Sequence, residues 1–148
     1  MINKLFKTSD DYAMTVARLI LGVVFFAHGA QKVLGWWGGY GFAGTMGFFT
    51  HQGIPAPLAF LAIMAEFLGG LGLIVGAVSR VAAFGILSNM VVAIATVHWP
   101  NGFFMNWFGN QKGEGFEYHL LAIALAVAII INGAGALSID RVVSRRIE

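Results

Sequence analysis

Four long stretches of the chain are almost free of charged side chains, and this feature limits the fold more than any other. A helix rises ~1.5 Å per residue, and about 17–25 residues cross the hydrocarbon core of a bilayer. The apolar residues run continuously instead of alternating, which is typical of membrane helices and not of the strands of a membrane barrel. The stretches are residues 12–33, 56–78, 81–97 and 116–132. We predict an all-α integral membrane protein, an antiparallel four-helix bundle that forms a single domain over residues 1–148.

The composition supports this prediction and excludes several functions. Hydrophobic residues make up 58% of the chain and charged residues 11%, whereas soluble domains have roughly 45–50% and about 25%. The sequence has no cysteine, which excludes disulfides and thiolate metal ligands. Its 9 Lys and Arg residues are spread thinly, without the dense basic face that binding to nucleic acid requires. We therefore expect the lipid bilayer, and not nucleic acid, as a partner.

Basic residues gather on one side of a four-span arrangement. Cytoplasmic loops of membrane proteins carry an excess of Lys and Arg. The basic residues on this side are Lys4, Lys7, Arg80, Arg141, Arg145 and Arg146. We place both termini in the cytoplasm, in a multi-pass protein of the cell (inner) membrane, with residues 34–55 and 98–115 as outer loops. The first apolar run is longer than the core of a signal peptide, so we expect a retained span.

The two outer loops are rich in aromatic residues, and the first is also rich in glycine. All four tryptophans fall in these loops, at Trp36, Trp37, Trp99 and Trp107. An aromatic belt at the membrane interface explains most of this pattern. Such belts usually occur at both surfaces, however, and the glycines allow the first loop to fold closely onto the helices. We therefore also expect that this loop forms a lid over an apolar ligand.

Two charged residues interrupt the apolar runs, Arg18 in the first and Glu66 near the middle of the second. An ionised group inside a membrane costs ~2.5–3.5 kcal/mol on insertion scales, so both side chains should face the protein interior and have partners. In two antiparallel spans their depths differ by only a few ångströms. We predict an Arg18–Glu66 ion pair, with a structural role and a functional role equally open.

Other ionisable residues cluster near the outer ends of the spans. They are His28, Lys32, His98, Glu114, Glu117 and His119. Together with Glu66 as the floor, they predict a polar pocket that faces outward. The spacing matches no metal-ligand motif, so we predict no metal. Imidazole and carboxylate groups at graded depths can instead hydrogen-bond and protonate a quinone-like headgroup. Each histidine alone can equally be a helix-end residue bonded to a backbone carbonyl.

With these residues in place, the chain resembles the DoxX family of small four-helix membrane proteins. The resemblance covers roughly residues 18–141. It is carried by Arg18-x-x-x-Gly22, Phe26-Ala27-His28-Gly29-x-x-Lys32, Glu66-x-x-Gly69-Gly70, Gly76-x-x-x-Arg80, His98 and Gly133-x-Gly135-x-Leu137-Ser138-x-Asp140-Arg141. The resemblance implies that six residues of the family pattern are functionally important: Arg18, His28, Lys32, Glu66, Arg80 and His98.

The resemblance implies a fold more clearly than an activity. The family takes its name from a subunit of an archaeal membrane thiosulfate:quinone oxidoreductase, and other members are linked to quinone or catechol stress and to oxidant defence. We expect a membrane component of a quinone-linked oxidoreductase or detoxification system, with quinone as the candidate cofactor. Without cysteine or a soluble redox domain, partner oxidoreductase subunits would have to deliver the electrons. Whether the chain is an enzyme therefore stays open.

In this hypothesis Glu66 and His98 are the catalytic residues, because they exchange protons with the headgroup, while Arg18 keeps Glu66 ionised. The ligand-binding residues are His28, Lys32, Glu117, His119 and Trp99. The alternative is a non-enzymatic membrane protein, either a scaffold for partner subunits or a small-molecule permease. Small residues in the second and fourth runs also allow a homo-oligomer.

Overall fold

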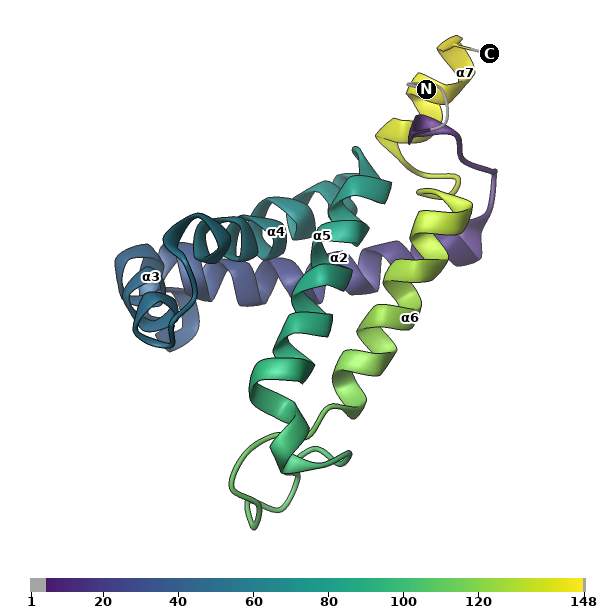
Figure 1. Ribbon diagram of the computed structural model, residues 1–148. Helices are drawn as coiled ribbons and strands as arrows, with labels where there is room; N and C mark the ends of the chain where they lie inside the picture. The colour runs from purple at the N-terminus through teal and green to yellow at the C-terminus, as the bar shows by residue number, and fades with distance from the viewer. Residues whose placement is uncertain (1–4, 148) are drawn as a thin grey trace.

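The computed structural model describes residues 5–147, and its regular elements are helices (Figure 1). Six longer helices follow in chain order. They are α2 (Tyr12–Leu34), α3 (Gly41–His51), α4 (Ala56–Val75), α5 (Ser79–Ala93), α6 (Glu117–Asn132) and α7 (Ile139–Ile147). Short turns of 3-10 or π helix lie at Trp36–Gly38, Ile94–His98 and Trp99–Asn101. The prediction of an all-α protein is confirmed. Lys4, one of the basic residues used for the topology, lies outside the described residues.

Three helical stretches are long and apolar enough to cross a membrane. They are Tyr12–Leu34 with 23 residues, Ala56–Val75 with 20, and the continuous run Ser79–Asn101 with 23. The third begins two residues before the predicted run, because Ser79 and Arg80 form the first turn of α5, and the π and 3-10 turns extend it past residue 97. The apolar helix α6 is shorter, with 16 residues. A multi-pass membrane protein is therefore confirmed, while the fourth span stays a prediction.

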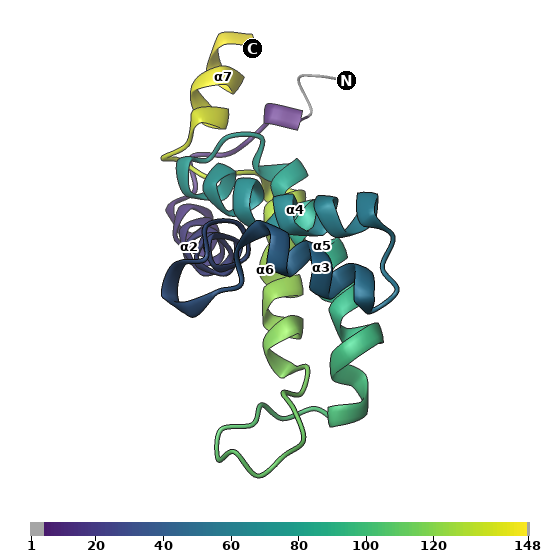
Figure 2. The same ribbon diagram turned by 90° about the vertical axis from the view of Figure 1, so that its left-hand side faces the viewer.

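The long helices form two antiparallel pairs that cross, instead of one bundle with a common axis. Helix α2 packs along α4, and α5 packs along α6. Figure 1 shows α2 and α4 running across the view while α5 and α6 run downward, and Figure 2, in which α2 is seen end-on, shows the same crossing. The prediction of a simple antiparallel bundle is therefore wrong in its geometry. The pairs meet near α7 and diverge toward α3 and the loop that follows α5.

Glycines allow the close approach of α2 and α4. A Cβ atom at Gly70 would collide with the backbone nitrogen of Phe26, and one at Gly29 would collide with the backbone of Phe67. The two backbones therefore touch where these glycines lie, as small residues permit between membrane helices. The side chains that fill the centre between the two pairs are almost fully buried, and the largest of them are Leu21, Phe25, Leu73, Ile86 and Ile129.

The end at which the two pairs meet, which we call the junction, is built around Arg18. Its guanidinium donates hydrogen bonds to the backbone carbonyls of Leu73, Ile74 (2.8 Å), Ala134 (2.8 Å) and Leu137 (2.6 Å). The predicted Arg18–Glu66 ion pair is therefore wrong. Backbone carbonyls at the C-terminal end of α4 and in the segment that follows α6 attract this cation, and Glu66 lies about two turns of α4 before Leu73.

The rest of the junction binds α7 and the N-terminal segment to the spans. The carboxylate of Asp140 accepts hydrogen bonds from the backbone N–H groups of Val78 (2.7 Å) and Ser79 (2.8 Å), and so caps α5. Gly76 adopts a left-handed conformation (φ 71°), and a Cβ there would collide with Ser138. The guanidinium of Arg80 donates to the carbonyls of Ile130 and Ile131 near the end of α6.

Candidate functional site

A cavity of about 540 Å³ lies between the two helix pairs, on the side where they diverge. Residues from α2, α3, α4, α5 and α6, and from the segment between α5 and α6, line it. The polar ones are His28, Lys32, Glu66, His98, Glu114, Tyr118 and His119. The structure therefore brings together five of the seven residues to which we assigned catalytic or ligand-binding roles, namely His28, Lys32, Glu66, His98 and His119.

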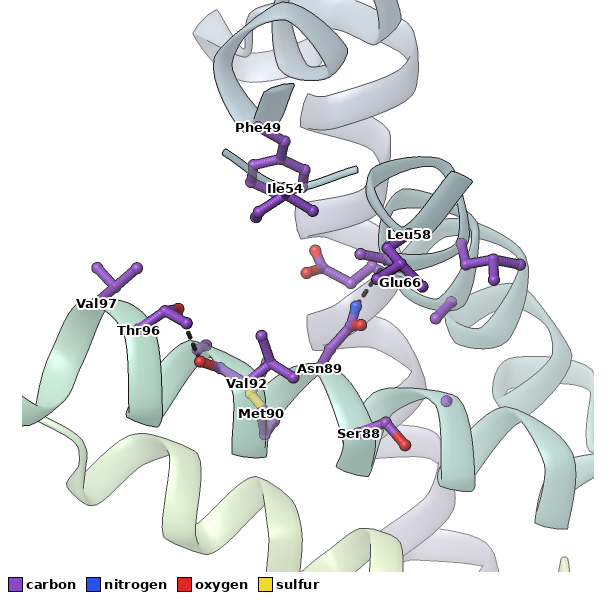
Figure 3. Close-up of a pocket in the computed structure, with 15 residues that line it drawn as sticks. Phe49, Ile54, Leu58, Glu66, Ser88, Asn89, Met90, Val92, Thr96 and Val97 are labelled. Carbon is purple, nitrogen blue, oxygen red and sulfur yellow. Dashed lines mark hydrogen bonds between the residues drawn. The ribbon is translucent and has the colours of Figure 1, made fainter. Parts of the chain in front are cut away.

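The charged centre of this cavity is an ion pair between Lys32 of α2 and Glu66 of α4. Lys32 follows His28 by one helical turn, so both side chains project from the same face of α2. The Glu66 side chain is 10% exposed and the Lys32 side chain 25%. Figure 3 shows the Glu66 carboxylate pointing from α4 into the space beside α5. Each charge thus neutralises the other where the surrounding protein offers little solvation.

His98 and His119 face each other from α5's extension and α6, with their ring centroids 4.0 Å apart. His98 Nδ1 lies 2.8 Å from the backbone carbonyl oxygen of Glu114. A carbonyl only accepts hydrogen bonds, so this contact assigns the proton to Nδ1 and leaves Nε2 as an acceptor. His119 is buried, and its Nδ1 has no hydrogen-bond partner within residues 5–147. The pair therefore offers unused imidazole nitrogen atoms.

Tyr118 is the lining residue that sequence reasoning missed. Its ring forms a triangle with those of Phe25, at 6.5 Å between centroids, and His28, at 6.4 Å. Its hydroxyl is buried and has no partner in the described part of the chain. A buried polar atom without a partner costs free energy, so it points to a group that the protein alone does not supply. A polar aromatic residue beside His119 in an apolar run was the signal available in the sequence.

Glu117 and Trp99 lie outside the lining of this cavity. Residues 117 and 119 are separated by about 200° around a helix, so Glu117 points away from the side of α6 that carries His119. Its carboxylate instead accepts a hydrogen bond from the backbone N–H of Met105 (2.8 Å). Trp99 is 66% exposed and stacks on Phe116 with 5.4 Å between centroids. Both residues therefore order the loop between α5 and α6.

The segment predicted as the first outer loop is more ordered than the sequence indicated, because it contains α3. Helix α3 packs against α2 and α4, the Thr45 hydroxyl donates to the Lys32 carbonyl (3.2 Å), and the Gly39 backbone lies against Gln31, where a Cβ would collide. Phe49 of α3 reaches the cavity and contributes to its wall. The loop thus folds onto the open end between the helix pairs.

The arrangement combines apolar walls with a few converging polar groups, which is typical of small-molecule sites. The walls are formed by Phe25, Phe49, Met90, Ala93, Val97 and Met105. Within residues 5–147 no three His, Asp or Glu side chains are placed to hold one metal ion.

Fold and site thus define a class: a multi-pass membrane protein with a polar cavity between two crossed helix pairs. Residues 13–99 match the model of the DoxX family, which is more than half of the chain. The chain belongs to the DoxX family, and the resemblance inferred from its motifs is confirmed.

Two curated relatives match along most of their length. A Bacillus subtilis (strain 168) protein named "Putative oxidoreductase CatD" is 29% identical over 132 residues, which cover 89% of this chain and 87% of the relative. An Escherichia coli (strain K12) protein named "Inner membrane protein YqjF" is 27% identical over 140 residues, or 95% of this chain and 98% of the relative. No solved structure matches the chain. The predicted location in the cell (inner) membrane is confirmed.

Proposed function

We propose that the protein is a membrane component of a quinone-linked oxidoreductase or quinone detoxification system, and that its cavity binds the head of a small apolar molecule of the quinone type. The observation that carries this proposal is a pair of residues in the wall of an apolar cavity, Tyr118 and His119, whose buried Oη and Nδ1 atoms have no partner in the described chain and which lie with the Lys32–Glu66 ion pair around that cavity. The oxidoreductase name of the Bacillus relative agrees with it.

The residues have distinct roles in this proposal. The Tyr118 hydroxyl and the Lys32 ammonium donate hydrogen bonds to the carbonyl oxygens of the head, and His28 orients it. Glu66 and His98 exchange protons with the head, since reducing a quinone to a quinol adds two electrons and two protons. The electrons come from a partner subunit or a diffusible reductant, because the chain has no thiol pair to supply them.

The membrane orientation is part of the same proposal. Arg80, Arg141 and Arg145 lie at the junction or beside it, and the positive-inside rule places that end in the cytoplasm. The cavity then opens on the outer side, with α6 as a fourth span and both termini cytoplasmic. The aromatic residues of the outer loops lie in the interface, and α3 covers the ligand as a lid.

Of the two alternatives, a permease is the less favoured. A transport path would continue from the cavity to the cytoplasmic side, past Arg18. Leu21, Phe25 and Ile86 instead fill the space between cavity and junction, and each is at most 2% exposed. A scaffold for partner subunits is favoured by Trp107 and Phe108 in the second outer loop, which are 80% and 91% exposed.

The proposal is tested by the small molecules that stay bound during purification. We expect quinone, measured by mass spectrometry, at near-stoichiometric amounts in the wild-type protein purified in mild detergent. Glu66→Gln should lose it while remaining folded, which thermal unfolding checks, although the loss of the partner of Lys32 lowers its stability. Glu117→Gln is the matched control, because Glu117 lies outside the lining, and it should retain the quinone. Equal retention by all three proteins, or lipids alone in the wild type, would contradict the proposal.

A further inference from the structure

A second cavity, of about 390 Å³, lies between α4 and α5 and adjoins the polar one, with which it shares part of its wall. We call it the lateral groove. Five residues line both cavities: Phe49, Glu66, Met90, Ala93 and Val97. Figure 3 shows Glu66 at one side of this space, with Met90, Asn89 and Ser88 following along α5. A molecule bound at Glu66 therefore has two directions open to it, the polar cavity and the lateral groove.

The lateral groove is apolar although several polar residues line it. The Ser88 hydroxyl donates to the Phe84 carbonyl (2.9 Å), and the Thr96 hydroxyl donates to the Val92 carbonyl (2.8 Å). The Asn89 amide donates to the Ala62 carbonyl of α4 (2.7 Å). These donors are thus used by the helices themselves, and apolar atoms make up most of the groove surface. Only its inner end, at Glu66, carries a charge.

The groove narrows at one end, and its side is open. Gly85 lies close to Ala65, where a Cβ at residue 85 would be 3.1 Å from the Ala65 Cβ, so the two helices are in contact there. The opposite side is bordered by Leu58, Leu61 and Val92, each more than half exposed. Because α4 and α5 belong to membrane-spanning stretches, these side chains face lipid. The groove therefore opens sideways into the hydrocarbon layer.

We propose that the lateral groove holds the apolar tail of a single-tailed amphipathic ligand whose compact head occupies the polar cavity. The ligand then enters from the lipid between α4 and α5, head first, and not from the water phase. This inference rests on the proposed function and specifies its substrate class: molecules that combine a hydrogen-bonding ring with a long alkyl or isoprenoid tail. The wall that the groove shares with the head site is what distinguishes this occupant from an ordinary annular lipid.

The test compares a tailed probe with a tail-less one. The full chain is reconstituted in nanodiscs, and the affinities of decylubiquinone and of ubiquinone-0, which lacks the tail, are measured. The concentration of each probe is expressed per mole of lipid. Ala93→Phe narrows the passage between groove and cavity, because Ala93 lines both. Ala95→Phe is the matched control, since Ala95 lies two residues away, is exposed and lines neither. Thermal unfolding of each variant checks that it is folded.

We expect Ala93→Phe to weaken decylubiquinone binding about tenfold, which is the loss of burial of about two methylene groups. Ubiquinone-0 binding should change much less, and Ala95→Phe should change neither. Equal affinity of wild type and Ala93→Phe for decylubiquinone overturns the groove assignment and leaves the proposed function intact. Failure of the wild type to bind either probe contradicts both.

A second measurement does not depend on any variant. A ubiquinone analogue with a photoreactive diazirine at the end of its tail is cross-linked to the wild type, and the modified peptide is mapped by mass spectrometry. Labels on residues 58–65 or 85–92 support the groove. Labels confined to α6 or the outer loops overturn it, as does labelling of the groove by a photoreactive phospholipid that excess decylubiquinone does not displace.

Discussion

The junction and the cavity both contain buried charge, but the protein uses that charge differently. At the junction, Arg18 donates to four backbone carbonyls and Asp140 accepts from two backbone N–H groups. In the cavity, Lys32 and Glu66 neutralise each other, while the Tyr118 hydroxyl and His119 Nδ1 have no partner in the described residues. Charges bonded to backbone at helix ends hold elements together, whereas the wall of the cavity keeps polar atoms that have no protein partner in the described residues.

Buried polar atoms without partners also occur outside the cavities. Ser79 Oγ and Arg80 Nε, at the start of α5, are also buried without partners in the part of the chain that the structure describes. They line neither the polar cavity nor the lateral groove, and the other nitrogens of Arg80 are bonded to carbonyls. An unpartnered buried atom therefore indicates a ligand site only where its residue also lines a cavity.

The largest effect is expected from Arg18→Met, which keeps a flexible stem like that of arginine and removes every donor. Four carbonyls at the meeting point of the helix pairs then lose their partners, and the free energy of unfolding should fall by about 3–5 kcal/mol. Denaturant unfolding in detergent micelles measures it. Arg145→Met, at an exposed position, is the control and should change stability by less than about 1 kcal/mol. Similar stability of the two variants would show that Arg18 does not stabilise the junction.

Asp140→Asn is expected to have the second largest effect on stability. The amide keeps one acceptor oxygen but loses the charge and the second acceptor, which cap the first turn of α5. A cost of about 1–2 kcal/mol follows from helix-capping measurements. Hydrogen exchange should increase first at residues 79–83, near the cap. Faster exchange in α6 instead, with α5 unchanged, would show that Asp140 does not act as a cap.

Tyr118→Phe should separate binding from stability. Removing an unpartnered buried hydroxyl leaves the free energy of unfolding unchanged or slightly raised. Binding of ubiquinone-0 should weaken about tenfold, the value of one lost hydrogen bond in an apolar site. Isothermal calorimetry in nanodiscs measures the affinity. A stability loss comparable with that of Asp140→Asn would place Tyr118 with the structural residues and would contradict the contrast between the junction and the cavity.

The smallest effect concerns Asp10 at the edge of the junction. Hydrogen bonds from Arg141, and also from Arg145, lower the pKa of the Asp10 carboxyl below its ordinary value of 3.8 against a smaller opposing effect of desolvation. A pKa lowered by folding means that Asp10 stabilises the folded state above pH 3.8, and that this stabilisation is lost as the pH falls through the folded-state pKa. Asp10→Asn should therefore reduce the acid dependence of thermal unfolding below about pH 4. If the pH dependence of thermal unfolding below about pH 4 is the same in Asp10→Asn and wild type, Asp10 makes no such contribution to stability.

The sequence predicted what hydrophobicity and depth determine. Runs of apolar residues indicated the spans, and the positions of His28, Lys32, Glu66, His98 and His119 within them predicted one cavity, which these five residues do line. Depth alone, however, does not say which partner a charge takes. Arg18 and Glu66 were paired in the prediction because they lie at similar depths, yet free carbonyls at helix ends bind Arg18, and Lys32 of the same helix reaches Glu66.

Other features depend on helix phase and crossing geometry, which residue spacing does not determine. Glu117 was placed in the pocket by its position, although its side chain points away from the face that carries His119. The close approach of α2 and α4 depends on the contacts at Gly29 and Gly70, and the crossing of this pair with α5 and α6 leaves the space that becomes the cavity. Tyr118 was missed because one tyrosine in an apolar run is usually part of the core.

The most direct measurement is an experimental structure of the protein in nanodiscs with decylubiquinone bound. The account predicts that a ring carbonyl lies within hydrogen-bond distance of the Tyr118 hydroxyl, that the ring lies beside Lys32 and Glu66, and that Arg18 keeps its bonds to backbone carbonyls. A ring bound elsewhere, with Tyr118 and His119 bonded to other protein groups, would contradict the assignment of the cavity as the binding site.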